Sequence, residues 1–121
     1  MKVLVVEDHR DTNDMLCRLL TREGYDTVSA YSGEAALELI GAERPELVIL
    51  DNMMPGMNGI EALRAIRETP DVARTPVIMY SAVADPAFRE HAMQRGANAY
   101  FVKGSMQFSD LLKMMGRLLA A

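Results

Sequence analysis

The sequence lacks several features that would point to special environments. It has one cysteine, Cys17, which cannot form an internal disulfide, and its Cys and His residues are not spaced as metal ligands would be. No apolar stretch approaches the length of a membrane span, and Met1 and Lys2 lead directly into a strand-like segment instead of a signal peptide. We therefore expect a cytoplasmic protein that does not contact a membrane.

The charge composition argues against a further class, the nucleic-acid-binding domains. The chain has 13 Lys and Arg residues against 17 Asp and Glu residues, a net charge of −4, and its basic residues are scattered. A nucleic-acid footprint usually appears as a clustered basic face, so we expect no direct nucleic-acid binding by this chain. A chain of 121 residues, half of them apolar, is expected to form one domain over residues 1–121.

Short apolar segments alternate along the chain with stretches of helical periodicity. The segments rich in Val, Ile, Tyr or Phe predict five strands, at residues 2–6, 25–30, 46–50, 76–80 and 99–102. Residues that commonly begin or end helices lie between them: Gly24, Pro45, Asn58, Asp85 with Pro86, and Gly96. The last helix is expected to begin at Ser105 or Ser109.

Strict alternation of strands and helices, with strands that are nearly continuous apolar runs, is typical of a parallel sheet covered on both faces. We predict an α/β fold with a single doubly wound five-stranded parallel sheet and five helices. In such sheets the ligand crevice lies beyond the carboxyl ends of the strands. Functional side chains are therefore expected directly after each strand.

Candidate functional side chains directly follow four of the five predicted strands, whereas the second ends in Tyr31 and Ser32. Glu7 and Asp8 follow the first strand, Asp51 the third, Ser81 the fourth and Lys103 the fifth. Two carboxylates about 4 Å apart repel each other by roughly 4 kcal/mol at an effective dielectric constant near 20, so gathering three of them needs a cation. An all-oxygen set with room for water and a phosphoryl group suits Mg²⁺.

This placement suggests a role for each side chain. Asp51 can act as a nucleophile towards phosphorus, and Lys103 and Ser81 can interact with the developing phosphoryl oxygens. Phosphorylated Asp51 would carry more negative charge than the carboxylate, and Lys103 and Ser81 could reorganise around it. The site therefore has the components of a switch.

Four segments carry a family resemblance: "LVVEDH", "LDNMMPGMNG", "MYSA" and "GANAYFVK". These segments resemble motifs of the receiver domain of bacterial two-component response regulators, and the resemblance spans essentially the whole chain. The resemblance implies a flavodoxin-like sheet of order 2-1-3-4-5 and a phosphorylation-activated function. It also implies that Asp51 accepts its phosphoryl group from a phosphohistidine on a sensor histidine kinase or a histidine phosphotransfer protein. Its Mg²⁺ ligands would be Glu7, Asp8, Asp51 and the backbone carbonyl of Met53.

The resemblance also implies how the signal leaves the domain. The hydroxyl of Ser81 would move towards the phosphoryl group, Tyr100 would follow, and the face of the fourth helix, the fifth strand and the fifth helix would change. That face would bind a downstream protein, a covalently linked output domain or a second copy of the chain. Such a domain is not a turnover enzyme, because it catalyses only its own phosphorylation and dephosphorylation.

Two departures from the family pattern lead to expectations of their own. Gly104 stands where the family usually has a cis-proline, and a cis bond at a non-proline residue costs about 2.5–4 kcal/mol, so a trans Lys103–Gly104 peptide is expected. Met53 and Val83, two residues beyond Asp51 and Ser81, cannot orient a water molecule by side-chain hydrogen bonding. We therefore expect slow loss of the phosphoryl group.

Two other functions stay open at this point. The chain could be a receiver-like docking module that signals without phosphorylation, for which Gly104 is the supporting feature. It could also be a Mg²⁺-dependent phosphohydrolase with an aspartyl nucleophile, although that class expects an acid or base where Met53 stands.

The ten methionines carry further expectations. Met15, Met79 and Met115 are expected in the core, whereas Met54, Met57 and Met106 are expected to be exposed near the active edge or the output face, where a partner could use them. His9, although it lies beside the acidic residues, is assigned no chemistry.

Overall fold

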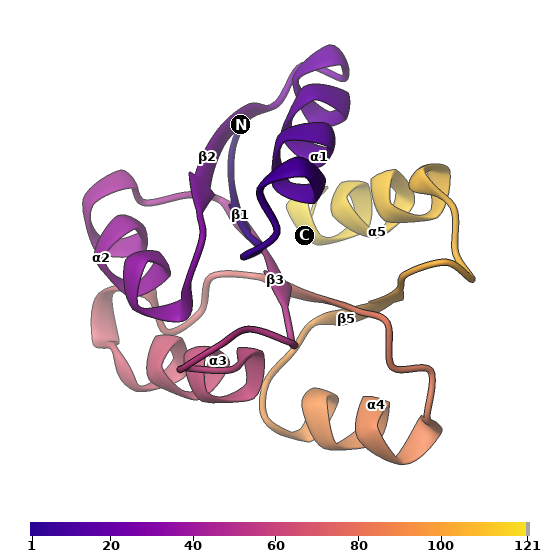
Figure 1. Cartoon of the computed structure of the whole chain (residues 1–121). Coiled ribbons are helices and arrows are strands. Elements are labelled where there is room, and N and C mark those ends of the chain that lie inside the picture. The colour runs from indigo at the N-terminus through magenta and orange to yellow at the C-terminus, as the bar shows by residue number, and fades with distance from the viewer. Residues whose placement is uncertain (121) are drawn as a thin grey trace.

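The computed structural model describes residues 1–120, in which strands and helices alternate (Figure 1). The strands are β1 (Lys2–Val6), β2 (Asp26–Ala30), β3 (Leu47–Asp51), β4 (Val77–Ser81) and β5 (Ala99–Val102). The helices are α1 (Arg10–Arg22), α2 (Gly33–Glu43), α3 (Gly59–Glu68), α4 (Pro86–Gln94) and α5 (Phe108–Ala120), with a short 3₁₀ helix η1 (Pro70–Val72) after α3.

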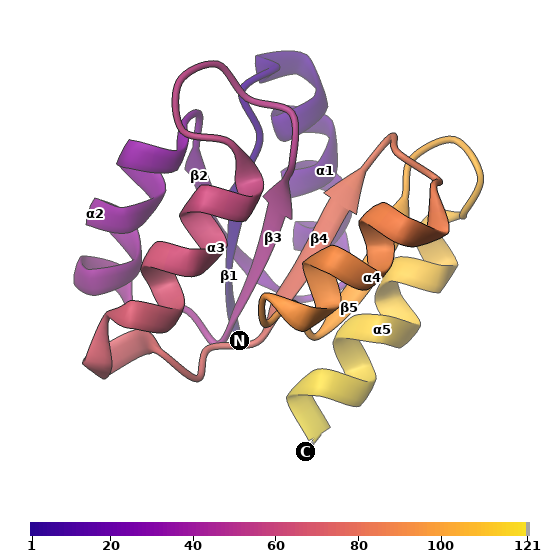
Figure 2. The ribbon, with the colours of Figure 1, turned by 90° about the horizontal axis from the view of Figure 1, so that it is seen from below.

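The five strands form one parallel sheet of order β2-β1-β3-β4-β5, which confirms the predicted topology. Helices α1 and α5 cover one face, and α2, α3 and α4 cover the other (Figure 1). The arrowheads of β3 and β4 point to the same edge of the sheet in Figure 2. We call this edge, where all strands end, the carboxyl edge.

The central strands are buried on both sides, as their apolar sequences predict. Along β1, Leu4 and Val6 pack under α2 and α3, whereas Val3 and Val5 pack under α1 and α5. Successive side chains of a strand point to opposite faces, so both layers of the core need apolar residues in the same strand.

Side-chain caps fix where several helices begin. The Asn58 side chain accepts from the Glu61 backbone N–H at 2.9 Å, and the Glu61 carboxylate accepts from the Asn58 backbone N–H at 3.1 Å. This reciprocal capping box starts α3 where the sequence predicted it. At α1, His9 accepts from the backbone N–H of Thr12 through Nδ1, at 3.3 Å.

The prediction for the start of α5 was wrong, because neither Ser105 nor Ser109 caps it. The helix begins at Phe108, and the backbone N–H of Gln107 donates to Oδ2 of Asp110 at 2.8 Å. The carboxylate of the third helical residue thus binds the backbone N–H of the residue that precedes the helix.

Two of the methionine predictions were also wrong. Met79 and Met115 are fully buried as expected, but Met15 is 48% exposed, because the inward-facing stripe of α1 is formed by Leu16 and Leu20. Met54, expected to be exposed, is 8% exposed and belongs to the buried cluster on the face of the sheet covered by α2, α3 and α4.

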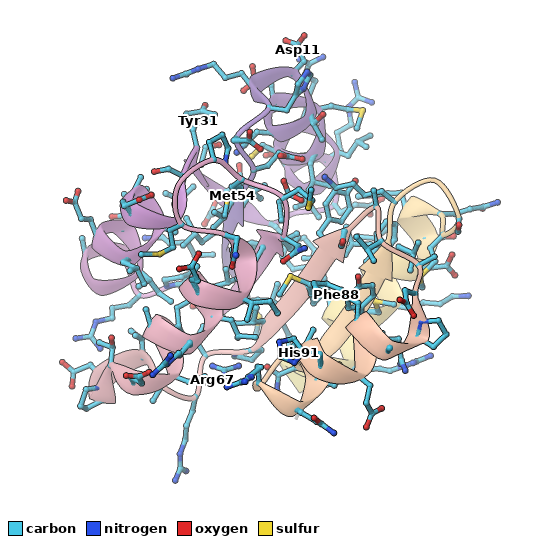
Figure 3. All side chains as sticks on the ribbon, turned by 60° about the horizontal axis from the view of Figure 1, so that its bottom comes forward. Asp11, Tyr31, Met54, Arg67, Phe88 and His91 are labelled. Atoms are coloured by element: carbon cyan, nitrogen blue, oxygen red, sulfur yellow. The ribbon has the colours of Figure 1, made fainter. Side chains whose placement is uncertain are left out.

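Arg67 ties the end of α3 to the amino ends of β4 and β5, opposite the carboxyl edge (Figure 3). Its guanidinium donates to the carbonyls of Ala73 at 3.0 Å, Thr75 at 2.7 Å and Gly96 at 2.8 Å, and to the amide oxygen of Asn98 at 2.8 Å. Within residues 1–120, no helix is long and apolar enough to cross a membrane.

Candidate functional site

The carboxyl edge brings the predicted acidic residues together. Glu7 and Asp8 directly follow β1, and Asp51 is the last residue of the neighbouring β3. Each of these three side chains offers a carboxylate oxygen, and the three oxygens lie within 4.8 Å of one another. The acidic cluster therefore exists as a spatial unit built from two adjacent strand ends.

Lys103 reaches this cluster along the carboxyl edge, from the end of the edge strand β5. It follows β5, and its Nζ donates to Oε1 of Glu7 at 2.8 Å and to Oδ1 of Asp51 at 3.2 Å. Residues 96 and 52 positions apart in the chain are thus joined by charge-assisted hydrogen bonds.

Burial makes the charge balance of the site unfavourable. Glu7 and Asp51 are each 3% exposed. Burial and a hydrogen bond with Glu7 raise the pKa of Asp51 to about 7, although the charge of Lys103 lowers it. Burial also raises the pKa of Glu7, but hydrogen bonds with Asp51 and Lys103 outweigh this effect and lower it overall. The two buried carboxylates, those of Glu7 and Asp51, share the single ammonium group of Lys103.

The donor set fits a hard divalent cation. Glu7, Asp8 and Asp51 offer only oxygen atoms, grouped closely enough to bind one ion. Burial is the main cause of the raised pKa of Asp51, and a bound cation would favour the charged form of this carboxyl. The backbone N–H of Met53 donates to Oδ1 of Asp51 at 3.3 Å, which places residue 53 next to the cluster. Its carbonyl as a further ligand stays a prediction.

Ser81 and Tyr100 are both bonded to one residue, Val83, in the segment between β4 and α4. The fully buried Ser81 hydroxyl accepts from the Val83 backbone N–H at 3.1 Å, and the Tyr100 hydroxyl donates to the Val83 carbonyl at 2.7 Å. The Tyr100 ring meets the Phe88 ring of α4 edge-on, with centroids 6.2 Å apart. These contacts connect the two residues to α4, while their switching role stays a prediction.

The loop that follows Asp51 depends on a glycine at its end. A Cβ at Gly59 would lie 2.5 Å from the carbonyl oxygen of Asp51 and 2.6 Å from Cα of Asn52. The Gly59 backbone N–H also donates to the Asn52 carbonyl at 2.9 Å. Only a residue without a side chain allows α3 to begin this close to Asp51.

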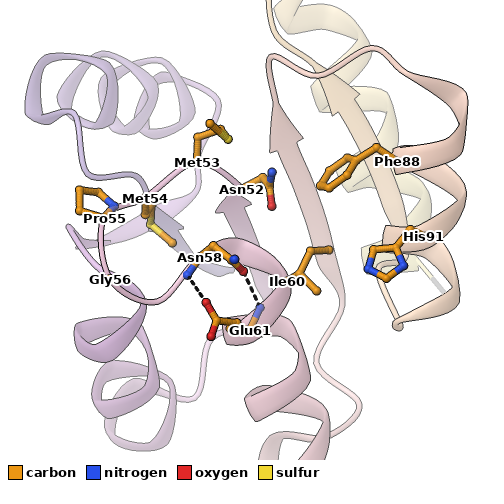
Figure 4. A pocket seen from close by; sticks show the side chains of 10 residues that line it. All are labelled: Asn52, Met53, Met54, Pro55, Gly56, Asn58, Ile60, Glu61, Phe88 and His91. Carbon is orange, nitrogen blue, oxygen red and sulfur yellow. Dashed lines mark hydrogen bonds between the residues drawn. The ribbon is translucent and has the colours of Figure 1, made fainter.

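A cavity of about 680 Å³ lies between this loop and α4 (Figure 4). Phe88 and His91 of α4 face Asn52 and Met53 of the loop across it (Figure 4). Movement of α4 would therefore change the surroundings of the residues that directly follow Asp51.

Asn13 supports the site from below, and sequence reasoning missed it. This fully buried side chain donates through Nδ2 to the carbonyls of Val5 at 3.3 Å, Glu7 at 3.1 Å and Ala30 at 3.2 Å. Its Oδ1 accepts from the Ser29 hydroxyl at 2.7 Å. The signal in the sequence is an amide on the same helical stripe as Leu16 and Leu20, where an apolar residue would be expected.

The strand order and the helical layers define a flavodoxin-like α/β protein with an acidic cluster at its carboxyl edge. Residues 3–115 match the family model of the response regulator receiver domain, and the chain belongs to this family, whose members work in two-component systems.

Curated relatives agree with this assignment. The transcriptional regulatory protein CpxR of Escherichia coli (strain K12) is 39% identical over 102 residues, which cover 84% of this chain and 42% of CpxR. The probable transcriptional regulator ycf27 of Porphyridium aerugineum is 38% identical over 102 residues, covering 84% of this chain and 41% of the relative. The match thus spans less than half the length of these relatives.

Solved structures agree as well. The BeF3-activated N-terminal receiver domain of Klebsiella pneumoniae RstA matches with a TM-score of 0.93 and 26% identity, covering 100% of both chains. The response regulator protein TrrA of Thermotoga maritima, solved in complex with Mg²⁺ and BeF, matches with a TM-score of 0.85 and 31% identity, covering 97% of both chains.

Proposed function

We propose that Asp51 of this receiver accepts a phosphoryl group from a phosphohistidine on a sensor histidine kinase or a histidine phosphotransfer protein. The observation that carries the proposal is the position of Lys103 Nζ, 3.2 Å from Asp51 and 2.8 Å from Glu7, at the edge of a three-carboxylate cluster. A surface salt bridge would not require this convergence of buried groups.

The transfer is a displacement at phosphorus. A carboxylate oxygen of Asp51 forms the new P–O bond while the P–N bond to the donor histidine breaks, and the leaving imidazole nitrogen keeps the electron pair and takes up a proton. Lys103 offers its positive charge to the phosphoryl oxygens. Because the Ser81 oxygen accepts from the Val83 N–H, the Ser81 hydrogen can be donated to a phosphoryl oxygen.

Glu7, Asp8 and Asp51, with the carbonyl of Met53, are the residues that would hold Mg²⁺. When bound, the ion offsets the negative charge that the carboxylates and the phosphoryl group share. Lys103 is the one ammonium group that contacts both Glu7 and Asp51 among residues 1–120. The domain is proposed to catalyse its own phosphorylation and dephosphorylation only.

The output surface is proposed to be the face formed by α4, β5 and α5. If Ser81 turns towards a phosphoryl group, its bond with Val83 is exchanged, and the same segment also holds Tyr100. We propose that this change regulates a downstream protein or a linked output domain in the cytoplasm, or association with a second copy, without nucleic-acid contact by these residues.

Phosphorylation by a small donor tests the proposal. With acetyl phosphate or phosphoramidate and Mg²⁺, intact mass spectrometry should show a gain of one phosphoryl group, which Asp51→Asn abolishes. Asp11→Asn is the matched control, because Asp11 is an exposed aspartate in the first turn of α1 (Figure 3). A wild-type protein that gains no mass would contradict the proposal.

The same experiment separates the two alternatives. A docking module that signals without phosphorylation would show no mass gain. Gly104, in place of the family's usual proline, is the feature that favours it, and the Lys103–Gly104 peptide is trans as expected. A phosphohydrolase would instead release phosphate over many turnovers without accumulating the phosphorylated protein.

A further inference from the structure

Tyr80 is an aromatic residue held rigidly beside the acidic cluster. It lies on β4 directly opposite Phe101 of β5, and the two rings are stacked with centroids 5.0 Å apart and an interplanar angle of 16°. Phe101 is 4% exposed, so the stack is anchored in the core. Cross-strand aromatic pairs of this kind fix the plane of each ring.

The ammonium group of Lys103 lies over the ring of Tyr80. Lys103 directly follows β5, the strand that carries Phe101. Its Nζ lies 4.8 Å from the centroid of the Tyr80 ring, within the range of a cation–π contact. The ammonium group therefore has three neighbours, which are Glu7, Asp51 and the ring of Tyr80.

The residue after Lys103 is a glycine, so no side chain lies beside the lysine at the next position. Gly104 has a φ of +82°, and a Cβ placed on it would meet no atom within 4 Å from residues 1–102 or 106–120. A cavity of about 180 Å³ lies on this side, and Tyr80, Phe101 and Gly104 contribute to its walls. The aromatic ring thus borders the lysine where the following residue leaves open space.

We infer that Tyr80 is a positioning residue that holds the Lys103 ammonium group in place for the phosphoryl oxygens on Asp51. The inference rests on the proposed function for its role in phosphorylation, but the contact itself can be tested without phosphate. The ring face attracts the cation and adds no competing acceptor charge, so Lys103 remains free to exchange a carboxylate for a phosphoryl oxygen. Because the ring face and not the hydroxyl makes this contact, a phenylalanine at position 80 should hold Lys103 as well as tyrosine does.

Nuclear magnetic resonance of the unphosphorylated protein tests the contact. Protons over the face of an aromatic ring shift upfield, so the ε-methylene signals of Lys103 should be upfield in the wild type and in Tyr80→Phe. In Tyr80→Leu this upfield shift should be lost, whereas Tyr31→Leu should leave it unchanged. Tyr31 is the matched control because its ring contacts a different cation, Arg10, at 4.1 Å from Cζ (Figure 3). Equal Lys103 shifts in Tyr80→Leu and the wild type would overturn the inference.

Phosphorylation rates test the consequence. With phosphoramidate and Mg²⁺, Tyr80→Leu should react about 3- to 10-fold more slowly, the range expected for loss of one partly buried cation–π contact, while Tyr80→Phe and Tyr31→Leu keep the wild-type rate. In a Lys103→Met background, Tyr80→Leu should cause no further loss. Circular dichroism establishes that each variant is folded.

The outcomes are distinguishable from failure of the proposed function. A wild type that is never phosphorylated contradicts the proposed function, and the Lys103 shifts then decide the inference alone. A phosphorylated wild type with an equally fast Tyr80→Leu variant, an equally slow Tyr80→Phe variant, or a full Tyr80→Leu effect in the Lys103→Met background overturns the inference.

Discussion

Replacing Asp51 by asparagine should make the protein more stable at pH 8 when divalent cations are removed by a chelator. The wild-type protein must then keep a buried carboxylate ionised beside Glu7, with Lys103 as the shared cation. Asparagine has nearly the same shape and carries no charge, so the variant avoids this cost. A residue at the centre of the site would thus be one whose removal strengthens the fold.

The size of the effect follows from the two pKa values of Asp51, which are 3.8 ordinarily and about 7 in the folded protein. Between these pH values the folded state binds more protons than the unfolded state, so stability falls as the pH rises. Each pH unit of this interval costs about 1.4 kcal/mol, which sets a ceiling of about 4 kcal/mol above pH 7. With partial relaxation of the site we expect a gain of about 2–4 kcal/mol for Asp51→Asn.

Urea denaturation at a series of pH values measures this gain. The difference between Asp51→Asn and the wild type should be largest above pH 7 and should shrink as the pH falls towards 4, where the wild-type carboxyl is protonated. Added Mg²⁺ should narrow the difference at pH 8, because it stabilises the wild type by binding to the folded state. Asp11→Asn, at an exposed position, should change stability little at any pH. A gain that is absent, or that is the same at pH 5 and pH 8, would refute the reasoning.

Three further predictions concern other parts of the molecule. Met53→Asn should speed loss of the phosphoryl group several-fold, because an amide can orient a water molecule; an unchanged rate in a phosphate-release assay contradicts this. Arg67→Met should lower the free energy of unfolding by about 2–4 kcal/mol, since several carbonyls lose a charged donor; thermal denaturation measures it, and a loss below 1 kcal/mol would count against the role of Arg67. Asn13→Ala should cost about 2–4 kcal/mol in the same measurement and should weaken Mg²⁺ binding, followed by titration, because the backbone of Glu7 loses a donor. Wild-type Mg²⁺ affinity in Asn13→Ala would show that this bond does not position the site.

The sequence was sufficient for the fold because each strand is a short apolar run bounded by helix-starting or helix-ending residues. Parallel strands place their carboxyl ends at one edge, so the sequence predicts that residues 7, 8, 51 and 103 converge. The observed distances around Lys103 agree with that expectation. What the sequence could not supply was the path of the loops: Met54 turned inward, and α5 began at Phe108.

The supporting residues were the hardest to foresee. Asn13 and Arg67 act through several carbonyl oxygens each, and the partners of those bonds come from separate parts of the chain. Tyr80 looks like an ordinary strand residue until its register with Phe101 places it beside Lys103. Strand register and loop path are properties of the folded chain, so pattern alone does not identify such residues.

Helix α3 is fixed at both of its ends, and this has a mechanical consequence. At one end Gly59 lies so close to the main chain of Asp51 that no side chain fits between them, and at the other end Arg67 is bonded to the segments preceding β4 and β5. A tilt of this helix would press its first residue against the main chain of Asp51 and Asn52, in addition to pulling on the loop of residues 52–58. A contact that displaces Arg67, opposite the carboxyl edge, would therefore be transmitted through α3 to the backbone beside Asp51.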